Sequence, residues 1–166
     1  MESNRKMKVT IGKYPKNPSD KRKVNVRIDK DDIWELDNTL AHIMIPALKA
    51  IKESKHGSPN VDDADVPEYL RATSSPPRKN KWDVDDNWHP RWNWVLDEML
   101  WAFEQHLTDW ETQYYSGEHD VHFIDGVMTK GENDTFVIDI DGLKAHEDRM
   151  IHGTTLFGKY YASLWT

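Results

Sequence analysis

Three stretches of the chain repeat apolar residues at spacings of three and four, which is the period of an amphipathic α-helix. They cover residues 31–56, 90–115 and 142–164. Asp31 and Asp32 suit the first turn of the first helix, and Gly57 suits a stop just beyond its end. The positions expected to be buried are Ile33, Leu36, Leu40, Ile43, Met44, Ala47, Leu48 and Ile51, then Trp92, Val95, Leu96, Met99, Phe103, Leu107, Trp110 and Tyr114, then Leu143, His146, Met150, Gly153, Phe157, Tyr160 and Leu164.

Alternating apolar residues predict two antiparallel strand pairs beside these helices. Residues 6–12 and 24–28 flank a turn rich in Pro and Asn, which is typical of a hairpin. Residues 121–127 and 135–140 form the second expected pair, with its turn at residues 131–134. The sequence therefore predicts an α+β fold with three main amphipathic helices and two antiparallel strand pairs. Its 166 residues fit a single domain, 1–166.

The longest irregular segment covers residues 58–90. A short helical turn is expected from Asp65 through Pro67 to Leu70, because Asp caps a helix and Pro is tolerated in its first turn. A segment of this length in a compact domain is usually functional or disordered. Trp82 and Trp88 favour an ordered segment.

Charge divides the chain into a basic N-terminal arm and an acidic helical body. Residues 1–30 hold ten of the 22 Lys and Arg residues but three of the 29 Asp and Glu residues. Residues 31–166 are consequently strongly acidic, and such a body repels a nucleic-acid polymer. The arm either binds nucleic acid or lies against the acidic body of its own or a neighbouring subunit. We favour the second interpretation.

Several classes of function lose their usual support in this sequence. The chain has no cysteine, which excludes disulfides, thiolate metal sites and a Cys nucleophile. It has no Gly-x-Ser-x-Gly, Walker or Gly-x-Gly-x-x-Gly motif, so we expect a protein that is not an enzyme and has no cofactor. The first residues lack a signal-peptide run, and no segment approaches a membrane span, so we expect a cytoplasmic protein without a membrane partner.

The densest cluster of metal-type ligands is His119, His122 and Asp125. Histidine and carboxylate side chains suit zinc, iron or manganese. In a strand, however, residues three apart face opposite sides, so the two histidines need a bulge to share a metal. Exposed polar residues on a strand are the favoured interpretation, and a metal-dependent phosphoesterase is an alternative.

A set of basic and aromatic residues suits an anionic ligand with a planar ring. Aromatic rings stack on bases, and an Arg side chain can bind two phosphate oxygens at once. The alternative is that the cations are ordinary surface residues and that Trp82 anchors the irregular segment to the core. The candidate ligand-binding residues are Lys52, Lys55, His56, Tyr69, Arg71, Arg78 and Trp82.

The second predicted helix is apolar on two sides. Trp94 and Trp101 lie roughly opposite its main stripe. A helix apolar on two sides is sandwiched by other elements or by another subunit. This pattern indicates a homo-oligomer.

Five stretches carry a resemblance to known proteins. They are LDNTLAH at 36–42, KESKHGSP at 52–59, VDDADVP at 61–67, WVLDEMLWAFE at 94–104 and FGKYYASLW at 157–165. Spread over most of residues 33–165, this pattern resembles a widespread group of small tailed-phage proteins. It is similar to the phage anti-defence sponges that oligomerise and sequester cyclic dinucleotides such as cyclic GMP–AMP, which blocks CBASS immunity.

The resemblance implies tight binding of a cyclic dinucleotide without cleavage, in the cytoplasm of an infected bacterium. It supplies no ligand-contacting residues, so the seven candidates above come from residue chemistry alone. The alternative within the same group is a phage structural or assembly protein that acts through protein interfaces.

Overall fold

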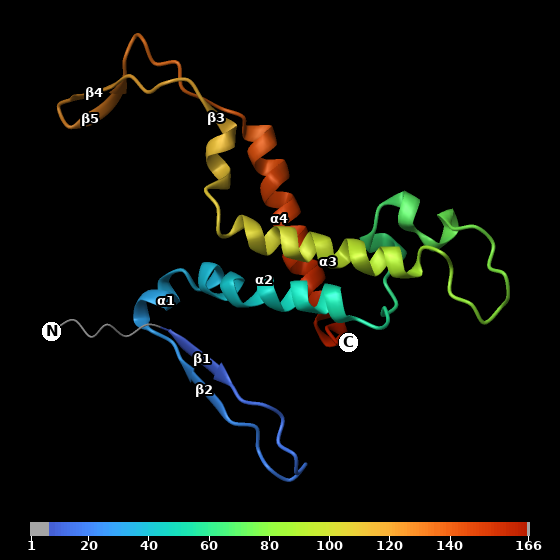
Figure 1. Cartoon of the computed structure of the whole chain (residues 1–166). Helices are drawn as coiled ribbons and strands as arrows, with labels where there is room; N and C mark the ends of the chain where they lie inside the picture. Colours follow the sequence, from blue (N-terminus) through green and yellow to red (C-terminus); the bar gives the residue numbers. More distant parts are fainter. Residues whose placement is uncertain (1–6, 166) are drawn as a thin grey trace.

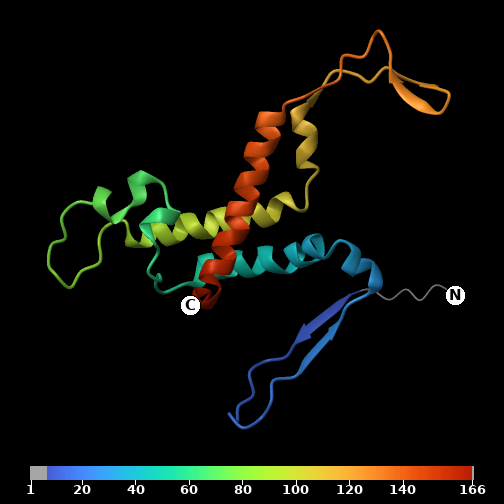
Figure 2. The same ribbon diagram turned by 180° about the vertical axis from the view of Figure 1, so that it is seen from behind.

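Three long helices form the centre of the computed structural model, which describes residues 7–165 (Figure 1). They are α2 (Leu36–Ser54), α3 (Trp88–Gln105) and α4 (Ile140–Tyr160). Helix α2 runs beside α3, and α4 crosses α3 and ends in the short turn η5 (Tyr161–Ser163) (Figures 1 and 2). The predicted α+β fold with three main helices is confirmed. Lys6, the expected start of the first strand, lies outside the described residues.

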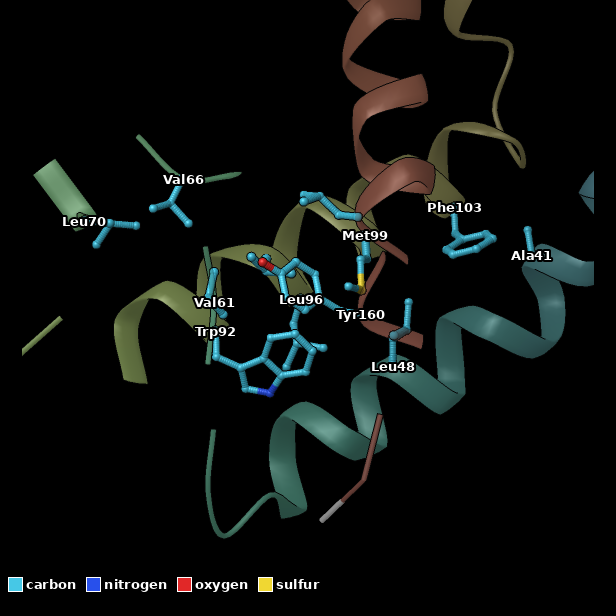
Figure 3. Packing of buried hydrophobic residues seen from close by; sticks show 12 residues of the cluster. Ala41, Leu48, Val61, Val66, Leu70, Trp92, Leu96, Met99, Phe103 and Tyr160 are labelled. Carbon is cyan, nitrogen blue, oxygen red and sulfur yellow. The ribbon is translucent and has the colours of Figure 1, made fainter. Parts of the chain in front are cut away.

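The hydrophobic core lies where the apolar stripes of the three helices meet (Figure 3). Helix α3 is central, since Trp92 and Met99 are fully buried there. Leu48 comes from α2, and Tyr160 comes from α4 with its ring centroid 5.8 Å from that of Trp92 in an edge-to-face arrangement. Burying a large apolar side chain contributes about 1.5–3 kcal/mol. The core positions predicted on α3 from Trp92 to Phe103 are confirmed.

The crossing of α3 and α4 depends on a glycine. A Cβ atom added at Gly153 would lie 2.5 Å from the Cβ of Ala102 and 2.5 Å from the carbonyl oxygen of Glu98. On the same helix, a Cβ atom added at Gly158 would have no heavy atom of a neighbouring described residue within 4 Å. The absence of a side chain at Gly153 therefore allows the backbones of α3 and α4 to approach closely, whereas Gly158 has no such role.

The second apolar face of α3 is covered by α4. The ring of Trp94 lies 6.1 Å from that of His152, and the ring of Trp101 lies 4.9 Å from that of His146. Both apolar faces of α3 therefore pack against helices of the same chain. By itself, it does not require a second subunit.

The first predicted helix is two helices. Helix α1 (Lys30–Trp34) begins with a capping box in which the Asp29 amide donates to the Asp32 carboxylate at 3.1 Å. Glu35 then leaves the helical conformation with φ −123° and ψ 60°. The prediction of a single helix over residues 31–56 is wrong. The apolar residues keep the helical period across Glu35, so the sequence pattern does not reveal the break there. Ile33, Leu36 and Leu40, which we expected to be buried, are exposed.

The second predicted helix ends ten residues early, at Gln105 instead of 115. The chain turns and forms η4 (Trp110–Tyr114), a short 3₁₀ helix. Trp110 then stacks on His146 of α4 at 4.4 Å, and the Tyr114 hydroxyl lies 3.0 Å from Nδ1 of His146. These contacts with α4 need the turn, so tertiary packing overrides the helical period.

The N-terminal strands form the predicted hairpin. Strand β1 (Lys8–Ile11) pairs with β2 (Val24–Arg27) in antiparallel register. The hairpin extends away from the three helices in both views (Figures 1 and 2). The basic arm therefore does not lie on the acidic body of its own chain, which corrects one of the two placements we expected. The other placement, on a neighbouring subunit, stays a prediction.

The second predicted strand pair has the wrong partners. Strand β4 (Val121–Ile124) pairs with β5 (Val127–Lys130) across Asp125 and Gly126, which have φ 52° and 79°. Asp-Gly is a strong signal for a two-residue hairpin turn, because both positions take positive φ. Strand β6 (Val137–Ile138) pairs instead with β3 (Tyr115–Ser116). The expected strand at 135–140 is short, since α4 begins at Ile140.

The irregular segment is folded into three 3₁₀ turns, η1 (Asp63–Asp65), η2 (Glu68–Leu70) and η3 (Ala72–Ser74). The expected single turn from Asp65 to Leu70 is thus divided in two, and Asp62 caps the first part by accepting from the Ala64 amide at 3.2 Å. Between residues 7 and 165, no helix has the length and apolar content needed to cross a bilayer.

Candidate functional site

The predicted ligand residues at the end of α2 act mainly on the helices themselves. Lys52 forms an ion pair with Asp97 of α3. The ammonium group of Lys55 donates to the Lys52 carbonyl at 3.1 Å, which satisfies a free acceptor at the helix C-terminus. His56 is exposed just beyond the helix. The structure therefore does not direct these three side chains at one common ligand.

The predicted ligand residues of the irregular segment are spread along its surface. The carbonyls of Tyr69 and Arg71 accept from the Asn87 side chain, each at 3.2 Å. Trp82 is 83% exposed, with the Lys81 ammonium 4.7 Å from its ring centroid. The alternative that Trp82 anchors the segment to the core is wrong.

A polar pocket of about 550 Å³ lies between the irregular segment, the start of α3 and the end of α4. Of the seven predicted ligand residues, only Arg78 lines it. Three carboxylates face three cations across the pocket. The lining residues are Asn60, Val61, Asp62, Asp63, Ala72, Arg78, Asp85, Trp88, Arg91, Lys159 and Tyr160.

Arg91 is the central cation of this pocket, and it is 2% exposed. Its two terminal nitrogens donate to the two Asp85 carboxylate oxygens, each at 2.8 Å, and one of them also donates to the Leu70 carbonyl at 3.1 Å. The Arg91 guanidinium lowers the pKa of the Asp85 carboxyl below its usual value. This double contact ties the irregular segment to α3. Arg91 was not among our predicted residues, although it stands four residues before Val95 on the buried stripe.

The opposite side of the pocket is closed by α4. The Lys159 ammonium lies 3.3 Å from the Asp62 carboxylate and also pairs with Asp65. The Tyr160 hydroxyl accepts from the Asp62 amide at 2.9 Å. Burial, followed by the hydrogen bond to Asp65, raises the pKa of Tyr160 to about 12. Since Arg91 and Lys159 are both held by carboxylates, the pocket presents little net positive charge to an anionic ligand.

The predicted metal cluster is divided by the fold. His119 stacks on Phe136 at 3.8 Å, and His122 pairs with Asp120 at 3.1 Å. Asp125 lies in the β4–β5 turn. Within residues 7–165, His, Asp and Glu side chains do not gather in a group of three or more that could hold a metal ion. The structure therefore offers no geometric support for the metal-dependent alternative.

A second cavity, of about 500 Å³, is mostly apolar and lies between α2, the end of α3, η4 and α4. We call it the α2–α4 groove. Two carboxylates, Asp37 and Glu147, belong to its lining, and no Lys or Arg among the described residues does. The lining residues are Asp37, Leu40, Phe103, His106, Trp110, Glu147, Met150, Ile151 and Thr154.

His146 holds η4 against α4 and should make this contact sensitive to pH. Burial, and secondly the charge of Arg149, lowers the pKa of His146 below its usual 6.5. Its Nε2 is buried without a hydrogen-bond partner in the described residues, so a proton there would lack an acceptor. A lowered histidine pKa means that the unfolded chain takes up the proton first. The stability that this contact contributes is therefore present above pH 6.5, and it is lost as the pH falls from 6.5 toward the lower pKa of the folded state.

We expect the urea concentration at the unfolding midpoint to be lower at pH 5 than at pH 7, as followed by tryptophan fluorescence. The control is His146→Phe, which keeps a ring in the stack but cannot take a proton. Its midpoint should fall less over the same range, and an equal fall in both proteins would contradict this role of His146.

The two long hairpins expose their apolar side chains. In the N-terminal hairpin (residues 8–27), Val9 lies opposite Val26 and Ile11 lies opposite Val24, and all four are exposed. In the distal hairpin (residues 121–130), Phe123 and Met128 lie directly opposite each other and are 73% and 66% exposed. Neither hairpin face is covered by the described part of the chain.

Comparisons with protein-family models, with curated proteins and with solved structures found no match to this chain. The resemblance to tailed-phage proteins therefore stays an expectation. The features that the fold offers for function are the polar pocket, the α2–α4 groove and the two exposed hairpins.

Proposed function

We propose that this protein binds other protein chains through its exposed hairpins, as an assembly or structural protein without catalytic activity. The observation that carries this proposal is the exposure of the apolar side chains on both hairpins. Of the functions considered for the sequence, assembly through protein interfaces is the one this geometry supports best.

No second layer from the described part of the chain covers the N-terminal hairpin. A two-stranded hairpin is marginally stable in water unless an apolar face packs on something. Exposed strand edges also offer free backbone groups for pairing with another chain. Covering the face that carries Val9 and Val26 would contribute about 25 cal/mol per Å² of apolar surface. A protein partner can supply that layer.

The distal hairpin has the side chains of an interface. Phe123 and Met128 share one face, and aromatic residues and Met are enriched in protein interfaces. On the other face, Ile124 lies opposite Val127, and both are exposed. Apolar residues on both faces suit a hairpin that inserts between partner surfaces.

Site-specific photocrosslinking in the cells that naturally make the chain tests this proposal. A photoreactive residue replaces Val24, Phe123 or, as a control of similar exposure, Lys144 on α4. We expect covalent adducts with protein from the two hairpin positions and few from position 144. If neither hairpin position forms a protein adduct, the proposal is wrong.

A cyclic-dinucleotide sponge is the second candidate function. The favouring observation is that Arg78 lines the polar pocket together with Trp88, while Trp82 is exposed in the same segment. A base could stack on an indole ring, and Arg78 could bind a phosphate. The carboxylates that already pair with Arg91 and Lys159 count against a dianionic ligand there.

A thermal-shift panel of cyclic dinucleotides tests the sponge. A ligand at a hundred times its Kd should add about 2.7 kcal/mol of stability. We expect the shift to be lost in Arg78→Ala and the ligand to be recovered intact after heating. Absence of stabilisation by every cyclic dinucleotide in large excess would remove this candidate.

A further inference from the structure

We infer that the apolar face of the N-terminal hairpin binds the α2–α4 groove of a second copy of this chain. The inference rests on the proposed function and names both the partner and the receiving surface. It is supported by the shape of the hairpin, the lining of the groove and the charges of both.

The N-terminal hairpin is amphipathic because residues directly opposite each other in an antiparallel pair point to the same face. One face carries the pairs Val9–Val26 and Ile11–Val24. The other face carries the pairs Lys8–Arg27 and Thr10–Asn25. The hairpin therefore has one apolar face to cover and one polar face to leave in water.

The α2–α4 groove offers a complementary apolar surface. Phe103 and Met150 form its nearly buried floor, while Leu40 and Ile151 are 44% and 56% exposed in its lining. Leu36, one turn before Leu40, is also exposed on α2. The apolar side chains in the first half of α2 are thus not covered by any described part of the chain.

Charge complementarity selects a second copy as the occupant. Residues 8–27 hold seven Lys and Arg residues and one Asp residue; five of the seven cations lie in the connection between β1 and β2, and the other two, Lys8 and Arg27, lie on the polar face. Within residues 7–165, the groove lining contributes Asp37 and Glu147 and no Lys or Arg. Opposite charges around an apolar contact speed association and fix its orientation. Each chain therefore carries both a basic apolar hairpin and an acid-lined apolar groove.

The contact is made between copies because the hairpin is directed away from its own helices. Only Ile28 and Asp29 separate β2 from α1, and Asp29 is held in the capping box of α1. Both views show the hairpin extending away from α2, α3 and α4 (Figures 1 and 2). If two copies exchange hairpins reciprocally, both apolar faces are covered and the dimer is closed.

Engineered cysteines test this contact cleanly, because the chain has none of its own. Ile11→Cys on the apolar hairpin face is mixed with a size-tagged Ile151→Cys chain under mild oxidation. The matched control is Thr10→Cys, which is next to Ile11 but on the opposite face. We expect a disulfide-linked species of one tagged and one untagged chain from position 11, and several-fold less from position 10.

A charge variant gives a second measurement that needs no disulfide. In sedimentation velocity, we expect the wild-type protein to have the mass of two chains. The dissociation constant of the dimer should be at least about tenfold higher for the Asp37→Lys/Glu147→Lys variant. Wild-type dimerisation that is unchanged in this variant would overturn the inference, as would equal crosslinking from positions 10 and 11 or none from position 11.

The two proposals can fail separately. If the photoreactive residue at position 24 attaches to a different protein and no 11–151 disulfide forms, the second-copy inference is wrong and the assembly function stands. If neither hairpin position attaches to any protein, the assembly function itself is wrong.

Discussion

Replacing Arg91 by Met lowers the free energy of unfolding by about 3–5 kcal/mol, the usual effect of removing one partner from a buried ion pair. The substitution leaves the Asp85 carboxylate, which is buried, without either of its 2.8 Å hydrogen bonds. It also removes a donor from the Leu70 carbonyl. An uncompensated buried charge is costly, so the irregular segment should detach from α3 before the core unfolds.

Urea denaturation and limited proteolysis check this prediction. We expect a lower urea midpoint and earlier cleavage within residues 58–90. The control is the double variant Arg91→Met/Asp85→Leu, which replaces the pair by apolar side chains and should recover most of the loss, because no charge is left unpaired. A single variant within about 1 kcal/mol of the wild type would show that the pair does not hold the segment.

The same substitution at two glycines of α4 should have opposite effects. Gly153→Ala should lower the free energy of unfolding by about 1–3 kcal/mol, because its Cβ would collide with Ala102 and with the Glu98 carbonyl. Gly158→Ala should raise it by roughly 0.5–1 kcal/mol, because the site is open and Ala favours a helix more than Gly does. Each protein serves as the other's control.

Urea denaturation at one temperature measures both changes. The urea dependence should keep the same slope in each variant, so that a shift in midpoint reports stability alone. A rise in the free energy of unfolding at both positions would show that helix propensity, and not the crossing of α3 and α4, decides the effect.

The helices were predictable because their signals are local. The apolar period identified all three long helices and the buried stripe of α3 from Trp92 to Phe103. It missed the break at Glu35, since Ile33, Leu36 and Leu40 keep the period across it. It also extended α3 too far, because the contact between Trp110 and His146 that turns the chain joins residues far apart in sequence.

The β4–β5 hairpin has a local sequence signal in its turn. Asp125 and Gly126 form the β4–β5 turn with positive φ at both positions, which an Asp-Gly pair announces directly. The prediction of the ligand-binding residues was not supported, because contacts between distant residues decide where their side chains lie. The sequence gives the charge of Lys52, but no local pattern predicts that it pairs with Asp97 on another helix.

The sequence by itself determined the three long helices, the basic arm, the acidic body and the strands of the N-terminal hairpin, because each depends on neighbouring residues. Only the tertiary structure decided that α4 covers the second face of α3 at Gly153, that Arg91 is buried against Asp85, and that the hairpins extend from the helices. These outcomes depend on which distant surfaces meet. A one-dimensional pattern can show that a surface needs a partner, but it does not say which surface supplies one.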